Sequence, residues 1–294
     1  MMPRWLPFAA SALGAAALAT VGLIGVAMRR WQLETEHLVK RLALTSEPEL
    51  DRAQTVSFEA LASLPPPVER YFRSVLRDGQ PFIRAARIVQ AGQFNMKMDG
   101  NDWRPYQATQ FYHLSPPGYV WDARVRLAPI LDVLVRDAYV ARHATMRGAL
   151  MAVVAVVNEH DRPELDEGAL QRYLAEAAMF PTALLPERGV VWSPIDENHA
   201  TASLTDGATT ACLDFAFAAT GEILGVSTAR RWRAEKSGYV IGAWGGRYGR
   251  YEVRNGMRVP SEADVYWNVD GRRCSYITIR VTDASFEFEP AVSR

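Results

Sequence analysis

The sequence of 294 residues predicts an α+β domain built mainly from antiparallel strands and preceded by one N-terminal transmembrane helix. Three observations lead to this prediction: an uncharged N-terminal run, two stretches with helical spacing of apolar residues, and about ten runs of alternating apolar and polar residues. Apolar residues make up 49% and charged residues 22% of the chain. These values are typical of a globular protein with a sizeable core.

The N-terminal 30 residues have the features of a membrane anchor. Trp5 to Met28 is a run of 24 residues without a charge, bounded by Arg4 on one side and by Arg29 and Arg30 on the other. As a helix with a rise of about 1.5 Å per residue, this run reaches about 36 Å, which is enough to cross a hydrocarbon core of about 30 Å. We therefore expect residues 5–28 to contact a lipid bilayer.

A cleaved signal peptide is the alternative interpretation of this segment. Ala17-Leu18-Ala19 resembles the small-residue site at which signal peptides are cut. The apolar run nevertheless continues to Met28 and is longer than the core of about 7–15 residues that is usual in signal peptides. The anchor is the interpretation that accounts for the whole run.

The charge balance argues against one class of partner. The chain has 33 basic and 33 acidic residues, and without Arg4, Arg29 and Arg30 it has 30 basic and 33 acidic ones. A mildly acidic body lacks the surplus of positive charge with which proteins hold a phosphate backbone. We expect no nucleic-acid partner.

An amphipathic segment and a linker join the anchor to the body. Residues 31–44 place Trp31 and Leu38 among charged residues at helical spacing, and residues 45–55 are mostly polar. The predicted organisation is an anchor at residues 1–30, the amphipathic segment and linker at residues 31–56, and a single α+β domain at residues 57–294.

Two stretches of the domain have the spacing and end signals of helices. The first, from Val68 to Leu76, follows three prolines and precedes Gly79. The second runs from Pro163 to Met179 and stops before Pro181.

Alternation of apolar and polar residues predicts strands through the rest of the domain. The runs are punctuated by hairpin turn sequences such as Asn255-Gly256 and Asp270-Gly271. Val133 to His143 is expected to form one strand. Gly148 to Val157 is nearly all apolar, and we interpret it as one buried strand, although its period also fits a buried helix.

The sequence has no motif that indicates a cofactor or a metal. Gly242 to Gly249 lacks the dinucleotide spacing and a following helix, so we expect a glycine-rich connection between strands. The five histidines show no i, i+4 pairing. Cys212 and Cys274 can form a disulfide or two buried thiols, and we favour buried thiols.

One predicted strand carries a row of charged residues. Asp122, Arg124 and Arg126 alternate with apolar residues and therefore project from one face of the strand. They form either a polar wall that holds a ligand headgroup or a solvent-facing surface whose ion pairs are each worth under about 1 kcal/mol. Arg136 and Arg142 on the next run are expected to face solvent.

The second predicted helix carries an ion pair. Arg172 and Glu176 are four residues apart and can pair on one helix face. The pair is a surface bridge, or it is buried beside Trp121 if the helix lies across the concave face of a sheet. The predicted ligand-binding residues are Trp121, Asp122, Arg124, Arg172, Tyr173 and Glu176.

Four separated motifs resemble a bacterial family of unknown function whose members often have one transmembrane segment before the domain. The motifs are LPPPVERY at 64–71, PGYVWDAR at 117–124, RYLAE at 172–176 followed by FPTALLP at 180–186, and GMRVPSE at 256–262. The resemblance extends from about residue 60 to residue 288. It implies no activity and no catalytic residues.

The order of elements also resembles the half-barrel of the periplasmic lipoprotein-carrier (LolA-like) group, in which a curved antiparallel sheet encloses helices and an apolar cavity. This resemblance implies a curved sheet of about ten strands packed on two or three helices. It also implies a body outside the cytoplasm, whereas Arg29, Arg30, Lys40 and Arg41 favour a cytoplasmic body by the positive-inside rule. We expect a single pass through the bacterial cytoplasmic membrane, with the body on the extracytoplasmic side.

These observations favour a membrane-anchored module that binds an apolar or lipid-like ligand between the sheet and the helix at residues 165–179. Two alternatives stay open. One is a membrane-tethered domain for protein interaction or for structure. The other is a hydrolase that uses His143 with a carboxylate, either Asp137 or Asp122.

Overall fold

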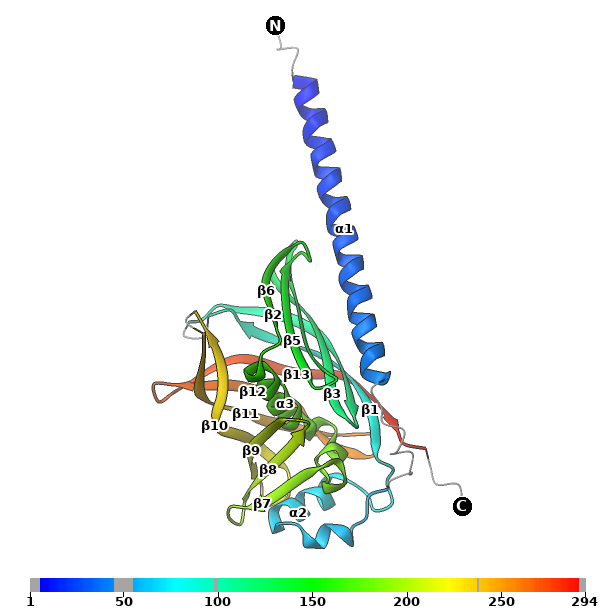
Figure 1. Ribbon diagram of the computed structural model, residues 1–294, viewed down its shortest axis with the longest axis vertical. Coiled ribbons are helices and arrows are strands. Elements are labelled where there is room, and N and C mark those ends of the chain that lie inside the picture. The colour runs from blue at the N-terminus through cyan, green and yellow to red at the C-terminus, as the bar shows by residue number, and fades with distance from the viewer. Residues whose placement is uncertain (1–5, 45–54, 98–99, 237, 291–294) are drawn as a thin grey trace.

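The structure is a computed structural model, and it describes residues 6–44, 55–97, 100–236 and 238–290, with side chains from residue 18 onward. Within these residues thirteen strands form one antiparallel sheet, which curves around a central helix (Figure 1). The curved antiparallel sheet agrees with the predicted half-barrel. The number of strands is higher than predicted.

The sheet consists of two meanders joined in the middle. Strands β1 to β6 follow one another across one half, strands β7 to β13 follow one another across the other, and β1 pairs with β13, for example at Ile88 and Ala284. The strands are β1 (Ile83–Asn95), β2 (Trp103–Leu114), β3 (Pro117–Ala128), β4 (Leu131–Val140), β5 (His143–Leu150), β6 (Val154–His160), β7 (Val190–Pro194), β8 (His199–Asp206), β9 (Thr209–Phe217), β10 (Ile223–Glu235), β11 (Gly238–Arg254), β12 (Met257–Val269) and β13 (Arg272–Phe288).

Three α-helices accompany the sheet in the described part of the chain. They are α1 (Leu6–Leu44), α2 (Pro66–Val75) and α3 (Pro163–Glu176). Short 3-10 turns lie at Ala60–Ser63, Ala177–Met179, Pro181–Leu184 and Pro186–Arg188. Because α3 links the two edge strands β6 and β7, the chain must return across the sheet, and α3 does so over the concave face (Figure 1).

The concave face is filled by α3 and the turns that follow it. Leu170, Leu174, Phe180 and Leu184 are fully buried against the strands. The ring of Phe180 lies 4.3 Å from that of Tyr112 on β2, measured between centroids. The predicted helices at 68–76 and 163–179 are therefore present, and the second one supplies much of the core.

The outer face of the sheet is covered in part by α1. The segment expected to be amphipathic, residues 31–44, is the C-terminal part of this helix, and Leu42 packs on Val120, Ala138 and Val140 of β3 and β4. Gly118 makes this approach feasible, because a Cβ there would lie 2.6 Å from Leu42 Cδ1. Most of the predicted linker, residues 45–54, lies outside the described residues.

The membrane-spanning helix predicted from Trp5 to Met28 is not confirmed. Among the described residues, no helix is both long enough and apolar enough to cross a membrane. Trp5 lies outside the described residues, as do the side chains of residues 6–17.

Two predicted strands are wrong because the chain turns where no turn residue marks the position. The run Val133–His143 is broken at Ala141 and Arg142, and the run Gly148–Val157 is broken at Met151 and Ala152. All four turn residues have positive φ, a conformation that usually selects Gly, Asn or Asp. The second run is therefore a hairpin between β5 and β6 and not a single buried strand.

Two further expectations need correction. Gly242 to Gly249 lies inside β11 and is not a connection between strands; a Cβ on Gly245 would lie 2.6 Å from the hydroxyl oxygen of Tyr266, so glycine allows that ring to pack on the strand. The cysteines are free thiols, but Cys212 is exposed and Cys274 is half-buried, so the prediction of buried thiols is wrong.

Candidate functional site

The six predicted ligand-binding residues divide between the two faces of the sheet. Trp121 points to the concave face, where Arg172, Tyr173 and Glu176 of α3 lie. Asp122 points to the outer face and accepts a hydrogen bond from α1. Arg124 follows on the same outer face, because side chains alternate along a strand. The structure therefore does not bring these six residues together in one site.

On the concave face, Arg172 joins α3 to the sheet. Its guanidinium donates to Asp137 Oδ2 at 2.6 Å and to Glu176 Oε1 at 2.9 Å, so the predicted i, i+4 pair is present. The guanidinium carbon also lies 4.9 Å from the centroid of the Trp121 ring and 5.1 Å from that of Tyr119. The pair is buried beside Trp121 and is not a surface bridge.

This inner cluster already satisfies its own charges. Burial by itself would lower the pKa of Arg172, but the carboxylates of Glu176 and Asp137 outweigh it and hold the pKa above its ordinary value. The second oxygen of Glu176 accepts hydrogen bonds from Gln110 and from the Tyr112 hydroxyl. We interpret the cluster as a structural tie, since a ligand headgroup would have to displace one of these partners.

On the outer face, a second cluster attaches α1 to the sheet. Trp31 Nε1 donates to Asp122 Oδ1 at 2.9 Å, and the Thr35 hydroxyl lies 3.1 Å from Asp122 Oδ2. Arg136 donates to the Thr35 hydroxyl oxygen at 3.0 Å and to the Trp31 carbonyl oxygen at 2.8 Å, and it stacks on the Trp31 ring. Arg136 is therefore buried beneath α1, and the expectation that it faces solvent is wrong.

Beside this cluster, a single carboxylate is surrounded by three guanidinium groups. Glu34 of α1 accepts hydrogen bonds from Arg30 at 3.1 Å, from Arg136 at 3.4 Å and from Arg147 of β5. Burial by itself would raise the pKa of Glu34, but Arg147, Arg136 and Arg30 together lower it. The Asp122 carboxylate also acts on Arg136, so three cations face two carboxylates, and one positive charge is left in surplus.

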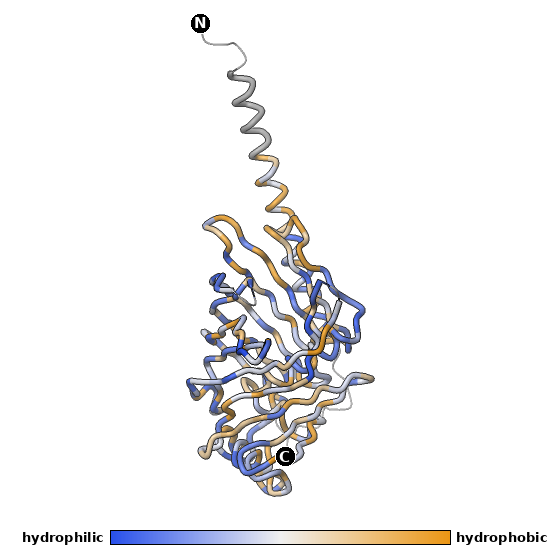
Figure 2. Tube along the Cα trace, turned by 90° about the vertical axis from the view of Figure 1, so that its left-hand side faces the viewer, coloured by the Kyte–Doolittle hydropathy of each residue, from blue (hydrophilic) through white to orange (hydrophobic). Residues whose placement is uncertain are grey.

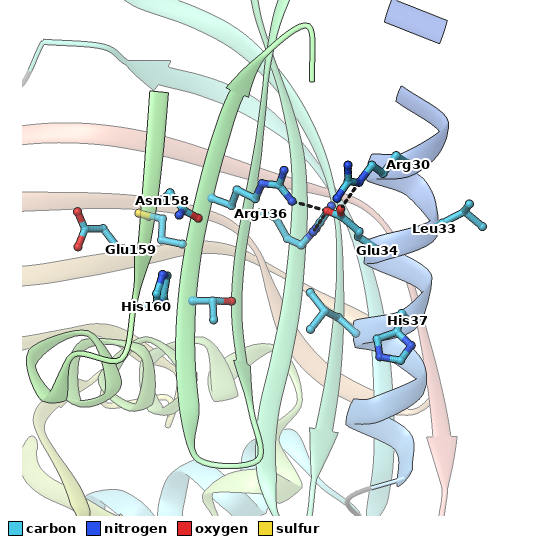
Figure 3. Close-up of a pocket in the computed structure, with 12 residues that line it drawn as sticks. Arg30, Leu33, Glu34, His37, Arg136, Asn158, Glu159 and His160 are labelled. Atoms are coloured by element: carbon cyan, nitrogen blue, oxygen red, sulfur yellow. Dashed lines mark hydrogen bonds and ion pairs between the residues drawn. The ribbon is translucent and has the colours of Figure 1, made fainter. Parts of the chain in front are cut away.

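A groove opens next to this cluster, between α1 and the outer face of β5 and β6. Its volume is about 520 Å³. In Figure 3, Glu34 contacts both Arg30 of the same helix and Arg136 of the sheet, and the carboxylate of Glu159 points away from α1. The residues that line the groove include Arg30, Leu33, Glu34, His37 and Leu38 on α1 and Arg136, Thr145, Arg147, Asn158 and His160 on the sheet.

The groove combines features that suit an amphipathic, negatively charged molecule. The side chains of Arg30 and Arg147 are partly exposed, and a guanidinium group can bind a carboxylate or phosphate. His160 and Asn158 add hydrogen-bonding groups, and Leu33 gives an exposed apolar contact. A pocket of this size with a few converging polar groups is a typical ligand site.

The motifs in the sequence are accounted for by one family. The model of the family of unknown function DUF6544 matches residues 54–279, well over half of the chain. The chain belongs to the DUF6544 family. This confirms the resemblance that the four motifs indicated. In this DUF6544 protein, α1 precedes the matched residues, so the groove lies between the family domain and the helix before it.

Two solved structures are similar to this DUF6544 protein. A LolA superfamily protein from Nitrosomonas europaea aligns over 80% of this chain and 96% of its own, with 9% identity and a TM-score of 0.34. A β-barrel-like protein of the DUF1849 family from Brucella abortus aligns over 70% and 99%, with 9% identity and a TM-score of 0.29. A search of the curated proteins finds no match. The half-barrel assignment rests on the strand order of the chain itself.

The residues considered for a hydrolase are not brought together in the DUF6544 fold. Asp137 faces the concave side and is bound by Tyr119 and Arg172, whereas His143 lies exposed at the start of β5. Asp122 is on the outer face, but it is level with Arg147, four residues along β5 from His143. At about 3.3 Å per residue this separates the two positions by about 13 Å along the strands, in addition to the width of two strand spacings between β3 and β5.

Sequence reasoning missed the residues that form the groove. Glu34 was part of an amphipathic segment, and Arg147 and His160 lay just outside the two ends of the apolar run Gly148–Val157 that was interpreted as one strand. The only signal was indirect: Arg30 and Glu34 are i, i+4 neighbours on α1 and form an ion pair. The contacts of Glu34 with the sheet join residues more than 100 positions apart.

Proposed function

We propose that this DUF6544 protein binds an amphipathic, lipid-like ligand with an anionic headgroup in the groove between α1 and β5–β6. The proposal keeps the ligand class suggested by the sequence and moves the site from the concave face to the outer face of the sheet. No catalytic step is part of it.

The observation that carries the proposal is the cluster around Glu34. Three guanidinium groups meet one carboxylate there, and Arg30 and Arg147 keep partly exposed side chains. A headgroup carboxylate or phosphate bound beside them would balance the surplus charge through charge-assisted hydrogen bonds, each worth roughly 1.5–3 kcal/mol.

The apolar part of the ligand has a surface to follow. Leu33 lines the groove with an exposed side chain, and the groove adjoins the apolar hairpin between β5 and β6. Each methylene group of a chain that leaves water contributes about 0.8 kcal/mol. A headgroup at the Glu34 cluster and a chain toward the hairpin would use both kinds of contact.

The same proposal places the protein at the bacterial cytoplasmic membrane, held by residues 5–28, with the body on the extracytoplasmic side. The support is the uncharged run from Trp5 to Met28 between flanking arginines. A reporter enzyme that is active only outside the cytoplasm, fused after Arg294, tests the side. Activity of that fusion supports the extracytoplasmic body, and activity of a cytoplasm-specific reporter alone contradicts it.

The ligand proposal is tested by lipid extraction and mass spectrometry of the full chain purified in a mild detergent. We expect an anionic amphipathic lipid to be retained, and Arg147→Gln to retain several-fold less of it. Arg258→Gln is the matched control, because Arg258 is similarly exposed, at 46% against 41%, and also has one carboxylate partner, Glu222. Equal retention by both variants, or no retained lipid in the unmodified chain, would contradict the proposal.

A further inference from the structure

The end of the β5–β6 hairpin is apolar and uncovered. From Gly148 to Val157 the chain has no charged and no polar side chain. Residues 153–158 are all exposed, with Val154 at 56% and Val156 at 55%. Because side chains alternate along a strand, β6 is uncovered on both of its faces. On the β5 side of the hairpin, Ala149 is buried in one cluster with Trp31.

The turn at the end of this hairpin is made of unusual residues. Met151 and Ala152 have φ angles of 50° and 61°, in the left-handed region that favours Gly, Asn or Asp. Each such residue costs about 1 kcal/mol or more in backbone strain. An Asn-Gly turn would have a lower backbone conformational energy. The turn therefore keeps apolar side chains although they make its backbone conformation less favourable.

Other exposed apolar residues lie at the same end of the molecule. Ile130, which precedes β4, is 87% exposed, and it is close to the hairpin turn because the Met151 amide donates to the Asp132 carbonyl oxygen at 2.9 Å. Helix α1 leaves the body beside this turn, where Met28 and Ala152 pack on one apolar cluster. Figure 1 shows α1 and the hairpin at this end, and Figure 2 shows the apolar colouring of both.

Basic residues lie next to these apolar segments, on the side nearer the body of the protein. Arg29 and Arg30 follow the apolar part of α1, Arg126 lies four residues before Ile130, and Arg147 precedes the hairpin run. The side chains of Arg30, Arg126 and Arg147 are all partly exposed. An apolar end followed by a layer of basic residues is the arrangement that suits the headgroup layer of an anionic bilayer.

We infer that the apolar end formed by residues 150–157 and Ile130 contacts the surface of a lipid bilayer. Exposure on both faces favours this partner over a protein, because docking of a protein partner on a sheet covers one face. A long apolar edge strand is also a feature that proteins avoid exposing to water. This contact adjoins the ligand groove but does not require a bound ligand.

The inference rests on the proposed function in one respect: the membrane anchor would turn the hairpin toward the bilayer. One experiment tests the anchor and the hairpin contact separately. Cys212 and Cys274 are replaced by serine in the full chain, and a single cysteine is introduced at Val26, Val154 or Val191. Val191 is the matched control, since it is an exposed valine, at 64%, on the opposite edge strand β7. Each cysteine carries an environment-sensitive fluorophore.

The labelled chains are reconstituted in vesicles of phosphatidylcholine and phosphatidylglycerol that contain a quencher attached to the acyl chains. We expect several-fold stronger quenching at residue 154 than at residue 191, and quenching at residue 26 as well. Quenching at residue 26 but not at residue 154 would overturn the hairpin contact and leave the anchor standing. Absence of quenching at both would overturn both.

A second copy of the chain paired along β6 is the competing occupant of this edge. Spin labels at residue 154 would then show strong dipolar broadening between chains in the same vesicles. Such broadening without lipid quenching at residue 154 would overturn the inference in favour of an interface between copies. Narrow spectra together with lipid quenching would support the bilayer contact.

Discussion

Arg172 holds two carboxylates of the concave face in place. Asp137 and Glu176 are both bound by its guanidinium and are largely shielded from solvent. Removal of a cation from a buried pair leaves its partners uncompensated, which is more costly than the net worth of the pair itself. The side chain therefore contributes to stability more than an exposed arginine of the same sheet would.

Replacement of Arg172 by methionine keeps the volume and removes the charge. We expect Arg172→Met to lower the free energy of unfolding by about 3–5 kcal/mol, measured by urea denaturation. Arg124→Met is the control, because Arg124 is partly exposed and lies 3.7 Å from its partner Asp132. Its effect should stay within about 1 kcal/mol. A loss in Arg172→Met no greater than in the control would show that the cluster is not a structural tie.

Glu34 gives the attachment of α1 a dependence on pH. Arg147, Arg136 and Arg30 lower the pKa of Glu34 below its ordinary value despite partial burial. A carboxylate with a lowered pKa in the folded state stabilises the fold above its unfolded-state pKa of about 4.3, and this stabilisation is lost as the pH falls through the lower folded-state pKa.

The variant Glu34→Gln should remove this dependence. We expect the stability difference between the unmodified chain and Glu34→Gln to be largest near neutral pH and to shrink below about pH 4, in thermal unfolding followed across the pH range. Glu36→Gln serves for comparison, since Glu36 is exposed on the same helix. A difference for Glu34→Gln that does not change with pH would contradict the assignment.

At the scale of elements, the C-terminal part of α1 is attached through a few contacts. Trp31 is buried, donates to Asp122 and is stacked by Arg136, and Leu42 fills the space above Gly118. We expect Trp31→Ala to release residues 31–44 from the sheet, because truncation of a buried tryptophan costs about 3–5 kcal/mol.

Hydrogen exchange measures this release directly. In Trp31→Ala, amides of residues 31–44 should exchange much faster, while those of β10 to β12 should keep their protection. Leu44→Ala is the control, because Leu44 is exposed on the same helix. Uniformly faster exchange over the whole chain would instead mean that Trp31 stabilises the domain globally.

The elements show where sequence reasoning succeeds and where it fails. Hairpin turns at Asn255-Gly256 and Asp270-Gly271 were predictable, because these residues adopt positive φ readily. The turns at Ala141-Arg142 and Met151-Ala152 have the same backbone conformation but no such residues. No local signal marks these two turns, and the strands on either side of each were therefore merged in the prediction.

At the scale of the whole molecule, local pairs were predictable and distant ones were not. The Arg172–Glu176 pair followed from its spacing of four residues on a helix. The contacts of Glu34 with Arg136 and Arg147 depend on α1 lying across the outer face of a sheet that forms much later in the chain. No local sequence pattern predicts that arrangement, so the groove could not be predicted from the sequence.

Photo-crosslinking determines where on the molecule the ligand binds. The full chain is incubated with an anionic lipid whose acyl chain carries a photoreactive group, irradiated, and digested for peptide mapping. We expect crosslinks in residues 30–38 and 145–160 that are reduced in Arg147→Gln and unchanged in Arg258→Gln. Crosslinks confined to α3 and the following turns, residues 163–188, would contradict this expectation and place the ligand on the concave face.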